Sequence, residues 1–236
     1  MLEIKNVTKT YGQLVALSDV SLTIEKGDIY GFVGHNGAGK TTLLKAIAGI
    51  HGIQSGTIMV DGFSISEHPI DVKKRIAYIP DNPDIYETLT GSEYLAFIGD
   101  VFKLEPHERE RSIEKYATLF EIIDRLSHPI SSYSHGMKQK LVIISALIHK
   151  PKLLLLDEPF VGLDPTASFK LKELFKEMCQ NGSAIFFSSH VLEVVEKLCN
   201  KVAIIKKGKI VAQGLTKDVV FNKSLENIFI DIQRES

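Results

Sequence analysis

The sequence predicts an α/β fold with a mixed, mainly parallel sheet, an antiparallel β region at the N-terminus and an inserted α-helical region. The N-terminal residues alternate between apolar and polar, as antiparallel strands with one solvated face do. Continuous apolar runs at 29–33, 153–156 and 184–187 are typical of strands buried on both faces, the last of them in a strand expected at 184–188. From about 88 to 150 the apolar spacing is helical, which indicates an all-helical block within a chain that otherwise alternates strands and helices.

The N-terminal strands are bounded by turn-forming residues. Asp61-Gly62 ends one strand, and Pro80 ends another that follows a basic helical turn starting at Lys73. Pro83 should keep the residues after it extended. Strands are therefore expected at 2–11, 20–25, 29–33, 56–61 and within 73–79.

Three helices are expected in the inserted block. Thr90 and Glu93 form a capping box before the first helix, and Glu105-Pro106 starts the second. The third begins near Gly136. Side chains that recur at helical spacing should be buried, namely Tyr94, Ile98, Val101 and Phe102, then Ile113, Tyr116, Ala117, Phe120 and Ile123, then Met137, Leu141, Ile144 and Ile148.

The C-terminal part returns to alternating elements. A helix is expected at 166–179, and a short helix at 191–198 should bury Val191, Val194, Val195 and Leu198. Two strands, 202–205 and 209–213, should form a hairpin through Lys207-Gly208. We therefore predict one domain with a core of 1–87 and 151–214, a helical subdomain of 88–150, and a C-terminal extension of 215–236 that is too short for a regulatory domain.

Composition excludes several classes of protein. The 236 residues are 44% hydrophobic, with 28 basic against 29 acidic residues, so no global field attracts the chain to nucleic acid or an anionic membrane. Cys179 and Cys199 lie outside any metal-ligand spacing, which favours reduced, buried thiols and the cytosol. No apolar run approaches the roughly 20 residues of a spanning helix, and the N-terminus has no secretory signal. The chain itself is not expected to cross a membrane.

The segment from Gly34 to Thr41 matches G-x-x-x-x-G-K-[ST], the phosphate-binding loop, and lies between an apolar strand and a helix start. Glycines let successive N–H groups face a phosphate, and the helix N-terminus adds positive partial charge. Lys40 would reach the outer phosphates and the Thr41 hydroxyl would ligate Mg²⁺. A glycine turn beside a surface lysine is disfavoured by the flanking elements. The expected binding residues are Gly34, His35, Asn36, Gly37, Ala38, Gly39, Lys40, Thr41 and Thr42.

Polar residues follow all three buried strands. After the strand that leads into the phosphate loop, the second ends in Asp157-Glu158 and the third in Ser188-Ser189-His190. Ligands bind beyond the carboxyl ends of parallel strands, so these groups should converge on one nucleotide. Asp157 would hold Mg²⁺, Glu158 would orient or deprotonate the attacking water, and His190 would contact the γ-phosphate or that water. The alternatives are a charged strand end and an ordinary loop histidine.

These residues, in this order, resemble an ATP-binding-cassette (ABC) ATPase, and the likeness extends from Leu2 to about Gly214. Tyr11 matches the aromatic residue that stacks on adenine in that family. The family signature corresponds to residues 133–137, where the resemblance implies that Ser134 and Gly136 bind the γ-phosphate held by a partner subunit. Asp164, in Gly162-Leu163-Asp164, matches the D-loop and would act across the dimer.

The chain also departs from the family pattern. Asp81 replaces a glutamine that touches Mg²⁺, and its carboxylate is one methylene shorter. His135 replaces a glycine and Met137 a glutamine in the signature, as in variants that resemble exporter ATPases. One subunit supplies the loop with Lys40, a carboxylate for the metal and a base, but it leaves one side of the γ-phosphate uncovered. Two subunits should therefore face each other head to tail.

The resemblance thus implies the Mg²⁺-dependent ATPase subunit of a transporter of the exporter kind, docked on an integral membrane subunit near 81–85 at the cytoplasmic face of the membrane. It would pair with a second copy or a homologous ATPase and bind no nucleic acid. The alternatives are a soluble nucleotide switch and a DNA-maintenance ATPase; the latter is disfavoured because no long coiled-coil heptads interrupt the chain.

Overall fold

The computed structural model describes residues 1–82 and 85–234 of the chain. The chain divides into two compact units. Unit 1 comprises Met1–Tyr78, Lys152–Pro159 and Phe175–Ser236, and unit 2 comprises Ile79–Pro151 and Phe160–Leu174.

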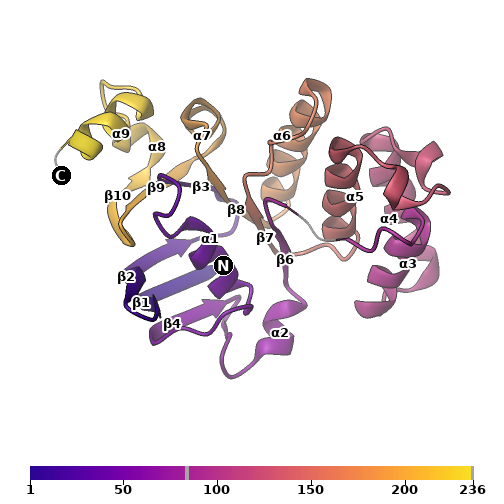
Figure 1. Ribbon diagram of the computed structural model, residues 1–236, viewed down its shortest axis with the longest axis horizontal. Helices are drawn as coiled ribbons and strands as arrows, with labels where there is room; N and C mark the ends of the chain where they lie inside the picture. Colours follow the sequence, from indigo (N-terminus) through magenta and orange to yellow (C-terminus); the bar gives the residue numbers. More distant parts are fainter. Residues whose placement is uncertain (83–84, 235–236) are drawn as a thin grey trace. The chain divides into compact units, whose positions relative to one another are not determined.

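The first sheet of unit 1 is antiparallel and has the strand order β2-β1-β4-β5 (Figure 1). It comprises β1 (Leu2–Tyr11), β2 (Leu14–Ile24), β4 (Ser55–Val60) and β5 (Phe63–Ser64). The antiparallel prediction is confirmed, but β2 begins six residues before the predicted Val20, because Gly12 at φ 58° closes a tight hairpin from β1. The short strand β5 was not predicted.

The second sheet has the order β10-β9-β3-β8-β7-β6. Strand β3 pairs in parallel with β8 and β9, and β7 pairs in parallel with β8, while the β9–β10 hairpin is antiparallel. The predicted mixed, mainly parallel sheet is therefore confirmed. The bounds are β3 (Ile29–Val33), β6 (Ile76–Ile79), β7 (Leu153–Asp157), β8 (Ala184–Ser189), β9 (Lys201–Lys206) and β10 (Lys209–Leu215).

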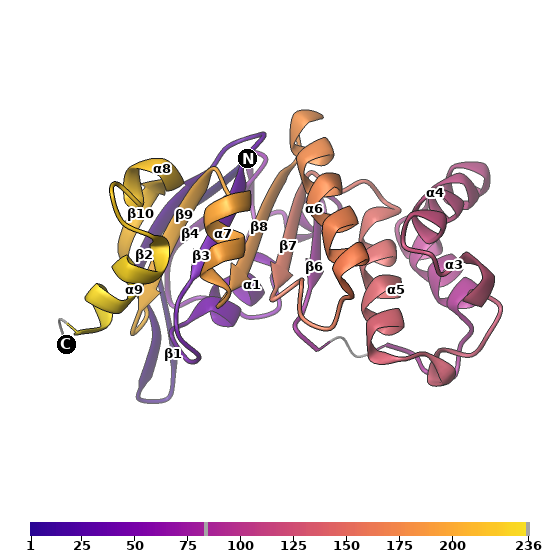
Figure 2. The same cartoon turned by 90° about the horizontal axis from the view of Figure 1, so that it is seen from above.

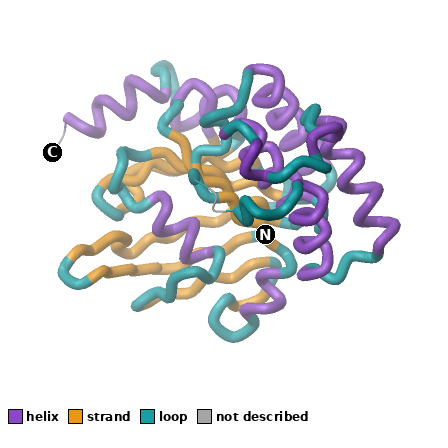
Figure 3. Tube along the Cα trace, turned by 45° about the vertical axis from the view of Figure 1, so that its right-hand side comes forward, coloured by secondary structure: helices purple, strands orange, loops and turns teal. Residues whose placement is uncertain are grey.

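Helix α1 (Lys40–Ile47) lies in the main core of unit 1. Its side chains Leu43, Leu44 and Ile47 are buried in one cluster with residues from both sheets. Figures 1 and 2 show α7 (Leu192–Leu198) on the opposite face of the second sheet from α1, and Figure 3 shows the strands of the two sheets as separate groups. The sheet is thus covered on both faces, which explains why all five residues of β3 and of β7 are buried. The remaining helices of this unit are α2 (Pro69–Lys73), α8 (Thr216–Val219) and α9 (Leu225–Arg234).

Unit 2 contains α3 (Gly91–Val101), α4 (Pro106–Leu119) and α5 (His135–Leu147), with short 3-10 turns at Ile123–Arg125 and Ile130–Ser132. Helix α6 (Pro165–Gln180) begins in unit 2 and ends in unit 1. The predicted capping box is confirmed, because Thr90 accepts from the Glu93 N–H and Glu93 accepts from the Thr90 N–H. The start of α4 at Pro106 is also as predicted.

Three apolar side chains predicted to be buried are exposed, and each lies at a helix end. Val101 is the last residue of α3 and is 58% exposed, while the next residue, Phe102, stacks on His149. Ile123 lies beyond the end of α4, where the helical period no longer holds, and Ile122 is buried in its place. Val191 precedes the first turn of α7 and is 41% exposed. The burial predictions for these three residues were therefore wrong, and each of the residues lies at or beyond the end of a helix.

Candidate functional site

The phosphate loop connects β3 to α1 and depends on two glycines that have no room for a side chain. A Cβ atom on Gly34 would lie 2.6 Å from the carbonyl oxygen of Ile205. A Cβ on Gly39 would lie 2.6 Å from the carbonyl oxygen of Ala16, and Gly39 has φ 113°, which L-residues rarely adopt. The loop can therefore pass between β9 and β2 only with glycine at these positions.

The Lys40 side chain is held against this loop. Its ammonium group donates hydrogen bonds to the carbonyl oxygens of Gly34 at 2.6 Å and His35 at 3.2 Å, and the residue is 6% exposed. Burial lowers the pKa of Lys40, and the nearby carboxylates of Glu158 and Asp157 oppose that shift. The result is a desolvated cation on carbonyl partners that a negative ligand could replace.

Asp157 ends β7 with both carboxylate oxygens engaged. The Thr41 hydroxyl donates to Oδ2 at 2.5 Å, and the Ser188 hydroxyl donates to Oδ1. Asp157 and Ser188 face each other in the parallel β7–β8 ladder, so the strand register itself creates the second contact. These two hydroxyls fix the carboxylate beside the first turn of α1, where it is 3% exposed.

Glu158 and His190 form a pair beside this carboxylate. Glu158 has φ 50°, a left-handed conformation that costs a non-glycine residue about 1–3 kcal/mol and that occurs at functional sites. The His190 Nδ1 atom lies 2.9 Å from Glu158 Oε1, and the His190 backbone N–H donates to Oε2 at 3.3 Å. The glutamate side chain is 13% exposed and the histidine side chain 59% exposed. The imidazole thus connects a nearly buried carboxylate to the open side of the site.

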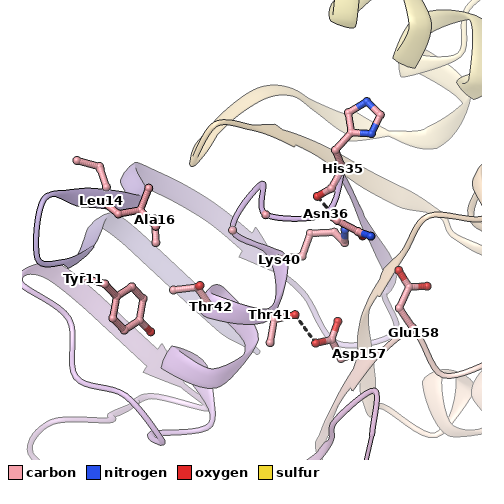
Figure 4. A pocket seen from close by; sticks show the side chains of 13 residues that line it. Tyr11, Leu14, Ala16, His35, Asn36, Lys40, Thr41, Thr42, Asp157 and Glu158 are labelled. Carbon is pink, nitrogen blue, oxygen red and sulfur yellow. Dashed lines mark hydrogen bonds between the residues drawn. The ribbon is translucent and has the colours of Figure 1, made fainter.

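A cavity of about 440 Å³ joins these groups to the β1–β2 hairpin (Figure 4). This volume lies within the usual range for a small-molecule site, roughly 300–1,000 Å³. Tyr11 lies at the end of the cavity away from Glu158, 43% exposed, with the Lys9 ammonium 4.9 Å from its ring centroid. The cavity is lined by Tyr11, Leu14, Val15, Ala16, His35, Asn36, Gly37, Gly39, Lys40, Thr41, Thr42, Asp157 and Glu158.

Unit 1 thus brings together many of the site residues predicted from the sequence. Tyr11, most of the phosphate loop with Thr42, Asp157 and Glu158 line this one cavity. His190 joins through its contact with Glu158. The predictions did not include Leu14, Val15 and Ala16, or the part that Ser188 plays in holding Asp157. The first group follows Tyr11 directly in the hairpin, which is the signal that could have identified it.

The other predicted site residues belong to unit 2. Ser134 caps α5 by accepting from the Met137 N–H at 3.3 Å, and the next residue but one, Gly136, is so close to the Gly162 carbonyl that a Cβ there would lie 2.9 Å from it. Asp164 pairs with Lys140 at 2.8 Å and caps α6 through the Ala167 N–H. The pKa of Asp164 is lowered first by the hydrogen bond from Lys140.

Asp81 also lies in unit 2 and is exposed. Of the predicted docking segment 81–85, Pro83 and Asp84 lie outside the described residues, as does the predicted extended conformation at Pro83.

The donor set beside α1 fits Mg²⁺. One carboxylate, Asp157, and one hydroxyl, Thr41, lie 2.5 Å apart, and Mg²⁺ is usually bound by one or two carboxylates together with substrate phosphates and water. Within residues 1–82 and 85–234, no group of three or more His, Cys, Asp or Glu side chains could hold a metal by itself. The site therefore suits a metal that arrives with a phosphate ligand.

The fold and the site together define a phosphate-loop nucleotide-binding protein. A glycine loop opens a helix at the carboxyl end of a parallel sheet, with a buried carboxylate beside its threonine and a glutamate–histidine pair next to that.

Comparison with known proteins identifies the family. Residues 17–161 match the family model described as ABC transporter. The chain is 37% identical over 214 residues to the ABC transporter ATP-binding protein NatA of Bacillus subtilis, covering 90% of this chain and 87% of that protein. It is 34% identical over 219 residues to the linearmycin resistance ATP-binding protein LnrL of the same species, covering 93% of this chain and 70% of that one.

Solved structures agree with this result. The structure of an ATP-binding subunit of an ABC transporter superimposes with a TM-score of 0.94 at 32% identity, covering 99% of both chains. A dimeric ATP-binding cassette bound to ADP and phosphate shares the fold, with a TM-score of 0.83 at 23% identity over 92% of this chain and 99% of the other.

The chain belongs to the ABC transporter family as an ATP-binding subunit, and it is an ATPase. The resemblance inferred from its motifs is confirmed. Among the helices of residues 1–82 and 85–234, none is both long and apolar enough to span a bilayer.

Proposed function

We propose that the 440 Å³ cavity binds ATP with the triphosphate on the phosphate loop and the adenine on Tyr11. The Lys40 ammonium would exchange the carbonyls of Gly34 and His35 for the outer phosphates. Its lowered pKa supports this exchange, because a desolvated cation gains most from an anionic partner. Residues 1–87 and 151–214 would form the nucleotide-binding core, with 88–150 as the helical subdomain and 215–236 as an extension.

Thr41 and Asp157 would hold Mg²⁺, with Asp81 as a further ligand. The metal would neutralise charge on the outer phosphates. Ser188 keeps the Asp157 carboxylate in one orientation through its hydroxyl. This fixed orientation means that the protein ligand need not reorganise when the nucleotide arrives.

Glu158 would orient or deprotonate the attacking water. Its carboxylate is 13% exposed and is fixed through both oxygens by the side chain and the backbone of His190. A base must be within hydrogen-bond reach of its proton, and Glu158 lines the same cavity as Lys40. Since Nδ1 of His190 faces Glu158, the other ring nitrogen, Nε2, would contact the γ-phosphate.

A second subunit would complete the site through Ser134 and Gly136. Both lie at the start of α5, whose free N–H groups and dipole favour an anion. Shifting a dimer from 1:99 to 99:1 closed takes about 5.5 kcal/mol. Charge-assisted hydrogen bonds contribute about 1.5–3 kcal/mol each, so roughly two to four across both sites suffice. Loss of the γ-phosphate would remove these contacts and reopen the dimer.

The subunit would drive an integral membrane partner, as an exporter, from the cytoplasmic face of the membrane. Unit 2 carries exposed apolar side chains suited to such a partner: Tyr86 is 59% exposed, Phe97 44% and Val101 58%, and the Tyr86 and Phe97 rings lie in edge contact at 5.7 Å. Export is supported by His135 and Met137 in the signature and by a relative named for resistance to linearmycin.

The convergence of Lys40, Asp157 and Glu158 on one cavity carries this proposal, and Glu158→Gln tests it. The variant should bind ATP with wild-type affinity, lose hydrolysis and accumulate an ATP-bound dimer, measured by calorimetry, phosphate release and size-exclusion chromatography. The matched control Glu67→Gln changes an exposed glutamate of the same unit and should behave as wild type. Hydrolysis near the wild-type rate in Glu158→Gln would show that another residue orients or deprotonates the attacking water.

A further inference from the structure

Helix α9 is bound to the rest of unit 1 by hydrogen bonds at both of its ends. At its start, Leu225 is fully buried and its N–H donates to Glu196 Oε2 at 2.8 Å. Near its end, the Lys206 ammonium donates to the Ile232 carbonyl at 2.5 Å. Glu196 belongs to α7, which follows His190, and Lys206 ends β9, which pairs with β3. Helix α9 therefore joins the two segments that flank the phosphate loop.

Between these ends, α9 contacts the phosphate loop itself. The Phe229 ring lies on the His35 ring, with centroids 4.8 Å apart and planes inclined at 53°. The backbone carbonyl oxygen of His35 accepts two hydrogen bonds, from the Lys40 ammonium at 3.2 Å and from the Ala38 N–H at 3.1 Å. His35 therefore contacts α9 through its side chain and the Lys40 ammonium through its backbone carbonyl.

The same contact forms the wall of a second cavity. Its volume is about 430 Å³, and its lining residues are Gly34, His35, Asn36, His190, Leu192 and Phe229. In Figure 4 the His35 ring points away from the end of the nucleotide cavity where Tyr11 lies. The Phe229 ring is the aromatic partner of His35 in this lining, and His190 lines the same cavity.

We propose that Phe229 is a positioning residue for ATP hydrolysis and that α9 braces the phosphate loop against the His190 segment. Phe229 acts through His35: it holds the imidazole on α9, which fixes the loop backbone that Lys40 leaves when the phosphates bind. Binding of a triphosphate should therefore change the environment of the Phe229 side chain. This inference rests on the proposed function only in requiring that the loop binds nucleotide phosphates.

The absence of tryptophan from the sequence allows a direct test. Phe229→Trp keeps an aromatic ring on His35 and introduces a single fluorophore there. Its emission should change saturably with ATP, ADP and tripolyphosphate in the presence of Mg²⁺, with midpoints that match the affinities from calorimetry. The matched control Ile230→Trp, at the neighbouring 40% exposed position, should not respond. If Phe229→Trp binds ATP calorimetrically but its emission does not change, the brace is overturned while the nucleotide site stands; no binding by either method would overturn both.

Kinetics distinguish positioning from a structural role. The free energy of an aromatic pair corresponds to a rate change of about twofold to tenfold. Phe229→Ala should therefore lower kcat by about this factor, with KM for ATP changed less. Phe229→Tyr should restore turnover, and Ile230→Ala should leave it unchanged. Wild-type kcat in Phe229→Ala, or an equal loss in Ile230→Ala, would refute the assignment.

Discussion

Replacing Ser188 by alanine removes the contact that orients the Asp157 carboxylate, together with the weaker hydrogen bond that the same hydroxyl accepts from the Glu158 N–H at 3.3 Å. The Ser188 side chain is fully buried and its hydroxyl donates to Asp157 Oδ1. A hydrogen bond to a charged group contributes about 1.5–3 kcal/mol. For a domain of this size each kcal/mol shifts Tm by about 2–4 °C, so Ser188→Ala should lower Tm by about 3–12 °C. Urea unfolding of the nucleotide-free protein would measure the free energy directly.

Ser189→Ala is the matched control, because Ser189 is also buried and its hydroxyl accepts a neutral hydrogen bond from the Val191 N–H at 3.0 Å. It should cost about 0.5–1.5 kcal/mol. Combining Ser188→Ala with Asp157→Ala should cost less than the two changes added together. Ser188→Ala should also raise the Mg²⁺ concentration that gives half-maximal ATPase activity. Equal destabilisation by the two serine variants, with no coupling to Asp157, would refute this account of the carboxylate.

The hydrogen bond from Lys152 lowers the pKa of Asp61 below 3.8, so its contribution to stability is present above that pH and is lost as pH falls through the folded pKa; the wild-type advantage over Asp61→Asn in urea unfolding should therefore vanish in acid. Burial raises the pKa of Cys179 to about 12 and also raises that of Cys199, so a thiol reagent at pH 8 should label both only after unfolding. Tyr11→Ala should weaken ATP binding about twofold to tenfold and leave tripolyphosphate binding unchanged, as measured by calorimetry, whereas Tyr11→Phe should keep ATP affinity.

The fold was predictable wherever one short stretch of sequence carries the whole signal. The five apolar residues of β3 are bounded by Asp28 and a glycine loop, and they form the strand as predicted. Elements were missed or mispredicted where the signal is short or lies at a helix end. Strand β5 has two residues, too few for a periodic pattern, and pairs with β4 across the Asp61-Gly62 turn. Val101 is the last residue of α3 and is exposed. The helical period predicts which side chains share a face, but tertiary contacts determine where that face ends.

The site was predictable to a similar extent. The functional residues of the phosphate loop are contiguous in the sequence, so its glycines, lysine and threonine could be identified together. The pairing of Glu158 with His190, and of Asp157 with Ser188, depends on the register of β7 against β8, which no local pattern specifies. The contact of Phe229 with His35 joins the two end regions of the chain and had no signal in the sequence.

Charged groups gather at both ends of β3, and the difference between their partners separates structure from function. At the start of the strand, Asp28 is 4% exposed and its carboxylate is bound by the Glu25 N–H, the Asn200 amide and the Lys201 ammonium. Each of these partners is a group of the folded chain. The Asp28 carboxylate therefore stabilises this end of the sheet, and none of its contacts is one that a ligand would replace. At the other end, the Lys40 ammonium is bound by backbone carbonyls, which an anionic ligand could replace. A buried cation with such partners gains most from an anion, which is why the proposed function places the triphosphate at this end. The completed pairing around Asp28 assigns the opposite end a structural role.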